Sequence, residues 1–187
     1  MSLFEPLFDA LNAAEVRYVV VGGFAAVLHG HARLTADIDL VVDLTPDEAK
    51  KAIQTLTRLG FRARAPVDPL GFADAIVRQQ WITEKGLRVF SLWDPSNPMV
   101  EVDLFAEHPI DFEGLWRRAE IIKLSRASVR IASIRDSGRD EWGAGWEAHR
   151  REQMILGLRA TPAQRLAWLE EVIALAYRMG ALPKRRD

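Results

Sequence analysis

The sequence contains no cysteine, which excludes disulfides, thiolate metal sites and cysteine nucleophiles. Any bound metal must therefore use oxygen or histidine ligands. The longest apolar run, residues 19–28, is ten residues long, against the roughly 20 that a membrane span needs. The first 11 residues carry acids and lack the basic stretch of a secretion signal. We therefore expect a cytoplasmic protein with no membrane span.

The chain also lacks a strong net charge. Its formal charge of −1 gives no global field that would draw nucleic acid to the whole surface, and we interpret the basic stretch at residues 117–130 as solvated surface. A composition of 49% apolar and 27% charged residues is typical of a folded globular protein. At 187 residues the chain has room for one well-packed domain with a small appendage.

The spacing of apolar residues and turn formers predicts an α/β (α+β) fold, a mixed sheet flanked by helices. Thr45, Pro46 and Glu48 combine an N-cap, a first-turn proline and a capping-box acid, so they should begin a helix that ends at Gly60. The other helices are predicted at residues 2–14, 24–29 and 112–119, and the strands at 17–21, 37–42, 61–65, 87–92, 99–105, 120–123 and 128–131.

The C-terminal part of the chain is predicted to lie outside the main domain. We expect a domain at residues 1–136 and a linker with a helical extension at 137–187, in which residues 146–158 are helical and Thr161 begins a helix to about Met179. The apolar face of this last helix is wide, because two adjoining stripes are apolar: Leu166, Leu169, Ile173 and Ala176, and Trp168, Val172, Leu175 and Met179. It can pack on the preceding domain, form a homo-oligomer or bind a partner protein.

Acidic residues alternate in two of the predicted strands. In residues 37–42 the strand period of two places Asp37 and Asp39 on one face, and in residues 100–104 it places Glu101 and Asp103 on one face. Neighbouring carboxylates repel one another unless a cation lies between them. Mg²⁺ prefers such oxygen ligands. If the strands are neighbours, Asp103 supplies a third carboxylate, with Glu101 as the alternative.

Residues 20–30, VVGGFAAVLHG, followed by residues 33–42, RLTADIDLVV, resemble the minimal nucleotidyltransferases of the DNA polymerase beta superfamily, in the branch of toxin-antitoxin and abortive-infection systems. The resemblance covers roughly residues 1–136. It implies an enzyme that uses Mg²⁺, or Mn²⁺, to move a nucleoside monophosphate from an NTP such as ATP to a partner toxin protein or tRNA. A cognate toxin or antitoxin is then the expected partner.

The resemblance also assigns roles to residues. Asp37 and Asp39 would bridge two metal ions, and Asp103 would hold the catalytic metal and assist acceptor deprotonation. The pair Gly22 and Gly23 would let backbone N–H groups approach the triphosphate, because glycine has no Cβ. Two further residues match family positions near the phosphates, Arg33 and Thr35.

The chain departs from the family pattern after Asp136. A lysine-bearing helix usually follows there, whereas this sequence has no lysine between Lys123 and Lys184. Two alternatives therefore stand beside the leading hypothesis. One is a catalytically degenerate antitoxin or scaffold that binds a partner through its C-terminal helices, and the other is a nucleotidyltransferase of small molecules such as aminoglycosides.

Overall fold

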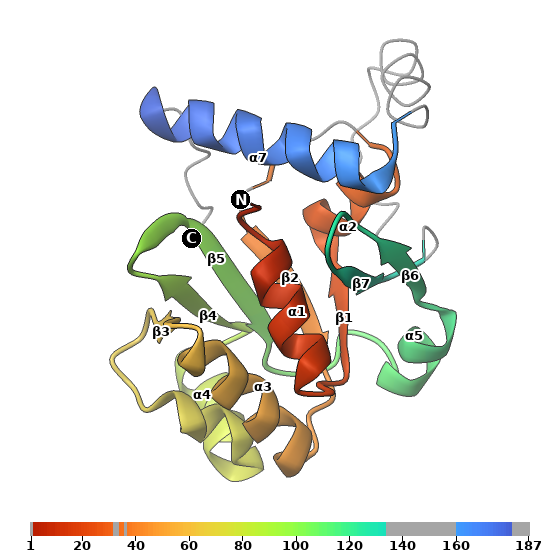
Figure 1. Ribbon diagram of the computed structural model, residues 1–187. Helices are drawn as coiled ribbons and strands as arrows, with labels where there is room; N and C mark the ends of the chain where they lie inside the picture. The colour runs from red at the N-terminus through yellow and green to blue at the C-terminus, as the bar shows by residue number, and fades with distance from the viewer. Residues whose placement is uncertain (1, 32–33, 36, 134–159, 181–187) are drawn as a thin grey trace, which may run out of the picture.

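The computed structural model describes residues 2–31, 34–35, 37–133 and 160–180. Its strands are β1 (Tyr18–Val21), β2 (Asp37–Val42), β3 (Arg62–Ala63), β4 (Val89–Asp94), β5 (Asn97–Phe105), β6 (Glu120–Lys123) and β7 (Ser128–Ile131). Its helices are α1 (Glu5–Ala13), α2 (Gly22–Leu28), α3 (Pro46–Arg58), the 3₁₀ helix η1 (Pro69–Ala73), α4 (Ala75–Lys85), α5 (Phe112–Arg118) and α7 (Pro162–Arg178). The predicted fold class is confirmed: helices flank a mixed sheet, and the C-terminal part includes a helix (Figure 1).

The strands form one sheet in the order β3-β4-β5-β2-β1-β7-β6. The sheet is mixed because β2 is antiparallel to β1 but parallel to β5, and β1 is parallel to β7. One face, together with α1, α3 and α7, forms the main core. The other face carries a smaller apolar cluster under α5, made of Val19, Val41, Phe112, Leu115 and Ala132. The two faces therefore differ in how much apolar surface they bury.

Helices α2, α4 and η1 differ from the sequence predictions, and β1, β3, β4 and β5 differ from their predicted bounds by one or two residues. Helix α2 begins at Gly22, so both glycines belong to its first turn and not to a loop before it. Helix α4 is absent from the predictions, although Asp74 caps its first turn and Gly86 ends it in the left-handed conformation. Arg78 is its one buried residue, and its apolar contacts with the main core come from the partly buried Trp81 and Ile82, so the sequence shows only a short apolar stripe.

The two predicted capping boxes have different outcomes. At α7 the box forms: the Thr161 hydroxyl accepts from the Gln164 N–H, and the Gln164 side chain accepts from the Thr161 N–H. At α3 the boundary is right, but the Thr45 side chain makes no capping bond. Glu48 instead accepts a hydrogen bond from the backbone N–H of Arg17 at 3.1 Å. A tertiary contact with the residue before β1 thus replaces the bond that Glu48 would make in the capping box.

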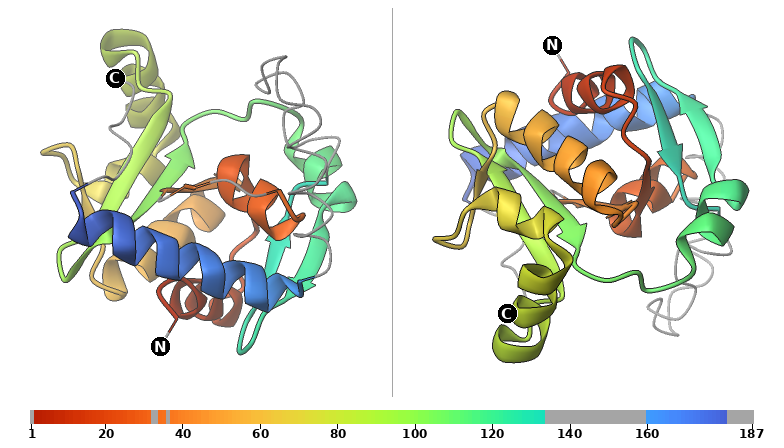
Figure 2. Two further views of the ribbon diagram at one scale, coloured as in Figure 1. Left: turned by 90° about the horizontal axis from the view of Figure 1, so that it is seen from above. Right: turned by 90° about the horizontal axis from the view of Figure 1, so that it is seen from below.

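Helix α7 packs on the main core and thereby covers one of the two apolar stripes of the helix (Figures 1 and 2). The stripe Leu166, Leu169, Ile173 and Ala176 is buried. Glu170 fixes the helix against the chain before α1, because its carboxylate accepts from the Ser2 hydroxyl at 2.5 Å and the Leu3 N–H at 2.9 Å. The guanidinium of Arg165 donates to the Leu28 carbonyl at the end of α2.

The second stripe of α7 lies outside the core. Trp168, Leu175 and Met179 are exposed by 45, 49 and 71%. The sequence also predicts a linker at residues 133–145, of which only Ser133 is described, and the predicted helix at residues 146–158 lies outside the described residues. Within the described ranges, no helix has the length and apolar character needed to cross a membrane.

Removing the Leu169 side chain should test the docking of α7. Leu169 is fully buried, so Leu169→Ala should lower the free energy of unfolding by about 2 to 5 kcal/mol. Leu175→Ala is the matched control on the exposed stripe and should change it by less than about 0.5 kcal/mol. Urea denaturation followed by circular dichroism measures both. Equal effects would contradict the packing of α7 on the core.

Candidate active site

The two acidic strands are neighbours in the sheet. Strands β2 and β5 run parallel, and their register sets Asp37 opposite Glu101 and Asp39 opposite Asp103. The alternate residues Ile38, Leu40, Val102 and Leu104 are fully buried in the main core. Because side chains alternate between the faces of a sheet, the four acids share the opposite face. Asp37, Asp39 and Asp103, predicted from sequence, are thus brought together on one face.

The acids differ in how deeply they are buried. Asp103 is buried, with 6% exposure, while Asp37 and Asp39 are half-buried. Val41, two residues beyond Asp39 on the same face, belongs to the apolar cluster under α5. The C-terminal end of β2 is therefore covered by a hydrophobic cluster, and the carboxylates lie at the N-terminal end of the strand.

Glu101 has a partner that sequence reasoning did not find. Arg64 binds its carboxylate with two nitrogens, Nε at 3.3 Å and Nη2 at 3.0 Å, and stacks on the Trp93 ring at 4.8 Å. This forked pairing holds Glu101 through both of its oxygens. It favours Asp103 over Glu101 as the third metal ligand. No local sequence pattern predicts the pair Arg64–Glu101, because its two residues are 37 positions apart in the chain.

Gly22 makes room for Asp39. Its φ is +64°, and a Cβ built on it would lie 2.2 Å from Oδ2 of Asp39. A side chain at this position would therefore displace the carboxylate. Gly23, by contrast, is buried in the first turn of α2. Of the two glycines, Gly22 is the one that adjoins the acidic strand.

Of the two residues predicted to lie near the phosphates, the structure describes Thr35 but not Arg33. Thr35 is half-buried, and its hydroxyl donates to the Asp37 carbonyl at 3.4 Å, just before β2 begins. Arg33 lies outside the described residues. His29, which ends α2, is buried and its Nε2 lies 2.7 Å from the Ala132 carbonyl oxygen, so its contact is structural.

The donor set can be compared with the needs of a metal. In the part of the chain that the structure describes, no group of three or more His, Cys, Asp or Glu side chains is arranged to hold a metal ion. Mg²⁺, however, is usually held by one or two carboxylates together with substrate phosphates. The adjacent pair Asp39 and Asp103, with Asp37 one step along β2, suits Mg²⁺ when a triphosphate supplies the remaining oxygens.

Alanine at Gly22 should be more harmful than the same change at Gly86. Both glycines have nearly the same backbone conformation, with φ of +64° and +63°, but a Cβ on Gly86 would meet nothing within 4 Å. Gly86→Ala should cost about 1 kcal/mol of unfolding free energy from backbone strain alone. Gly22→Ala should cost about 1 to 3 kcal/mol more, because the new Cβ crowds Asp39. Equal losses in urea denaturation would show that the carboxylate moves aside freely.

Comparison of the sequence with protein-family models gives no match, and comparison with curated proteins gives none either. The case for this site therefore depends on its own residues: the register of β2 with β5, the contact of Gly22 with Asp39, and the motif in residues 20–42.

Proposed function

We propose that the protein is a Mg²⁺-dependent nucleotidyltransferase that moves a nucleoside monophosphate from an NTP to a macromolecular acceptor, a partner toxin protein or tRNA, in a toxin-antitoxin or defence system. The observation that carries the proposal is the parallel register of β2 with β5. It brings Asp39 beside Asp103 across more than sixty residues of chain. Such a cluster of carboxylates, with a glycine-opened helix start beside it, suits metal-assisted phosphoryl transfer.

The adjacent Asp39 and Asp103 would hold the metal together with oxygens of the triphosphate, and Asp37, two residues before Asp39 on β2, would complete the set. When bound, Mg²⁺ supplies positive charge that offsets the charge of the triphosphate and of the departing pyrophosphate. Arg64 supports this assignment indirectly, because it neutralises Glu101 and leaves the three aspartates as the remaining acids on this face of β2 and β5. Gly22 gives the Asp39 carboxylate the space that it needs.

The transfer is an in-line displacement. The acceptor hydroxyl oxygen forms a bond to the α-phosphorus, the bond from that phosphorus to the bridging oxygen breaks, and pyrophosphate leaves with the electron pair. Asp103 takes the hydroxyl proton in this scheme.

A second candidate function has its own observation. The outer stripe of α7 exposes Trp168, Leu175 and Met179, and apolar residues gathered on a surface often mark a protein interface. A degenerate nucleotidyltransferase that acts as an antitoxin or scaffold would use this stripe and would need neither metal nor NTP. Metal and nucleotide binding therefore separate the two candidates.

Replacing Asp39 should remove transfer while the fold remains. Asp39→Asn deletes one carboxylate of the proposed metal set, so the rate should fall by about 100-fold or more. The assay incubates the protein with Mg²⁺, each labelled NTP in turn and lysate of the source cell, and follows label on protein and RNA. Stabilisation against heat by Mg²⁺ with NTP should shrink in the same variant.

Asp9→Asn is the matched control, since Asp9 is exposed on α1 and should retain full transfer. Undiminished transfer by Asp39→Asn would contradict the catalytic assignment. A wild-type protein that transfers no label, and that Mg²⁺ and NTP do not stabilise, would favour the scaffold.

The two acids of β5 should differ in their effects. Asp103→Asn should lose transfer as Asp39→Asn does, whereas Glu101→Gln should retain it within about tenfold, because Arg64 already occupies Glu101. The same label-transfer assay compares them. The reverse order of effects would make Glu101 the third ligand and would require Arg64 to release it.

A further inference from the structure

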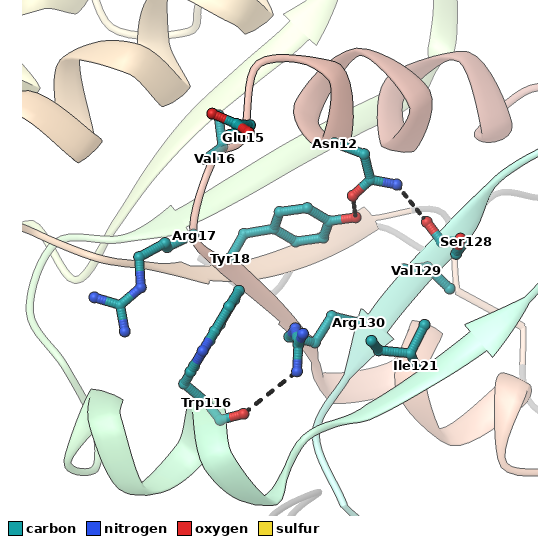
Figure 3. Close-up of a pocket in the computed structure, with 10 residues that line it drawn as sticks. All are labelled: Asn12, Glu15, Val16, Arg17, Tyr18, Trp116, Ile121, Ser128, Val129 and Arg130. Carbon is teal, nitrogen blue, oxygen red and sulfur yellow. Dashed lines mark hydrogen bonds between the residues drawn. The ribbon is translucent and has the colours of Figure 1, made fainter.

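A cavity of about 370 Å³ lies where the end of α1, the start of β1, α5 and the β6–β7 hairpin meet (Figure 3). None of the four acids of β2 and β5 lines it. Its size is within the range of small-molecule sites. Its lining combines apolar and polar side chains: Asn12, Glu15, Val16, Arg17, Tyr18, Trp116, Ile121, Ser128, Val129 and Arg130.

The space follows from the way β1 meets β7. These parallel strands share a single register pair, Val20 with Ile131, and the cavity residues of both strands come before that pair. The gap is bridged by side chains. The Tyr18 hydroxyl donates to Oδ1 of Asn12 at 3.0 Å, and Nδ2 of Asn12 donates to the Ser128 carbonyl at 2.7 Å (Figure 3). These bonds join α1, β1 and β7, so the wall of the cavity is already formed.

Two guanidinium groups contact the indole of Trp116. Arg17 lies 5.1 Å from the ring centroid and Arg130 lies 3.9 Å from it. The charge of Arg17 is matched by carboxylates, Asp43 at 2.5 Å and Glu113 at 2.6 Å. The hydrogen bond to Glu113 raises the pKa of Arg17, against the opposing effect of burial.

Arg130 differs from Arg17 in this respect. Among the residues that the structure describes it forms no ion pair, and its guanidinium donates a hydrogen bond to the Trp116 carbonyl at 3.5 Å. It is nevertheless half-buried. A guanidinium carries five N–H donors in a planar fork that suits carboxylate or phosphate. Trp116 holds the Arg130 guanidinium at the cavity. Its hydrogen bond to a described residue is the one to the Trp116 carbonyl, so most of the guanidinium donors remain for another group.

We propose that this cavity binds a small organic anion, with one carboxylate or phosphate group on Arg130 and an apolar body against Ile121. Ile121 lies opposite Arg130 in the β6–β7 register, and its side chain is 59% exposed, so it offers apolar surface beside the charge. Glu15 lies at the other end of the cavity from Arg130 (Figure 3). Its carboxylate disfavours a second anionic group there.

The site is tested by titrating the full-length protein with benzoate, phenyl phosphate and neutral benzyl alcohol in a calorimeter at constant ionic strength. Saturable binding of benzoate or phenyl phosphate, and none of benzyl alcohol, is expected, and the tighter of the two anions identifies the head group. Arg130→Gln should weaken binding by about tenfold or more, because it removes the charged fork. Arg62→Gln, an exposed arginine on β3 at the far edge of the sheet, is the matched control and should bind as the wild type does.

Ile121→Glu is a second variant that spares the core, since Ile121 is exposed. The new carboxylate lies opposite Arg130 and should replace the anion, so binding should be lost while circular dichroism and the urea midpoint stay near wild type. No saturable binding of either anion to the wild type would overturn the proposal. So would equal affinities of Arg130→Gln and Arg62→Gln. The test is independent of the proposed transferase activity, and Asp39→Asn should bind the anion unchanged.

Discussion

The parallel pairing of β2 with β5 is the constraint on which the rest of the structure depends. One face of this pair supplies Ile38, Leu40, Val102 and Leu104 to the main core, all fully buried. The other face carries the acids. Because side chains alternate, a shift of one residue in either strand would bury carboxylates in the core and expose its aliphatic side chains. The core therefore fixes the register, and the register fixes which acids meet.

Four acids on adjacent strands repel one another, and two neighbouring residues determine how the acids are accommodated, one by its charge and one by its small size. Arg64, held on the Trp93 ring, neutralises Glu101. Gly22 opens the start of α2 so that the Asp39 carboxylate has space next to the helix. Neither residue is acidic, yet both determine how the acidic face is arranged. A bound cation would complete the compensation in the proposed enzyme.

Helix α7 shows how a segment distant in sequence completes the fold. Its buried stripe belongs to the same core cluster as α1 and β5, and Glu170 accepts hydrogen bonds from the residues that lead into α1. The division at residue 136 stays a prediction about the chain, but the packing of α7 against the sheet domain shows that the two parts share one core. The outer stripe of α7 stays exposed.

The sequence by itself determined the features that local rules govern. The bounds of β2, β6 and β7, the start of α3 and the capping box of α7 follow from side-chain alternation, turn residues and cap chemistry. Helix α4 was not predicted because its apolar stripe is short: Arg78 is its one buried residue, and Trp81 and Ile82 pack only partly on the core. The common face of Asp37 and Asp39 also followed from alternation alone.

Tertiary structure decided what no local pattern encodes. The strand order makes Asp103 the neighbour of Asp39. From the sequence alone, that adjacency of the two strands could only be assumed. The pairing of Arg64 with Glu101 joins residues far apart in the chain. So does the pairing of Arg17 with Asp43 beside Trp116, whereas Arg130 on the same ring has no carboxylate partner among the described residues. Contacts of this kind depend on which strands become neighbours, and that choice is made by the burial of the whole core.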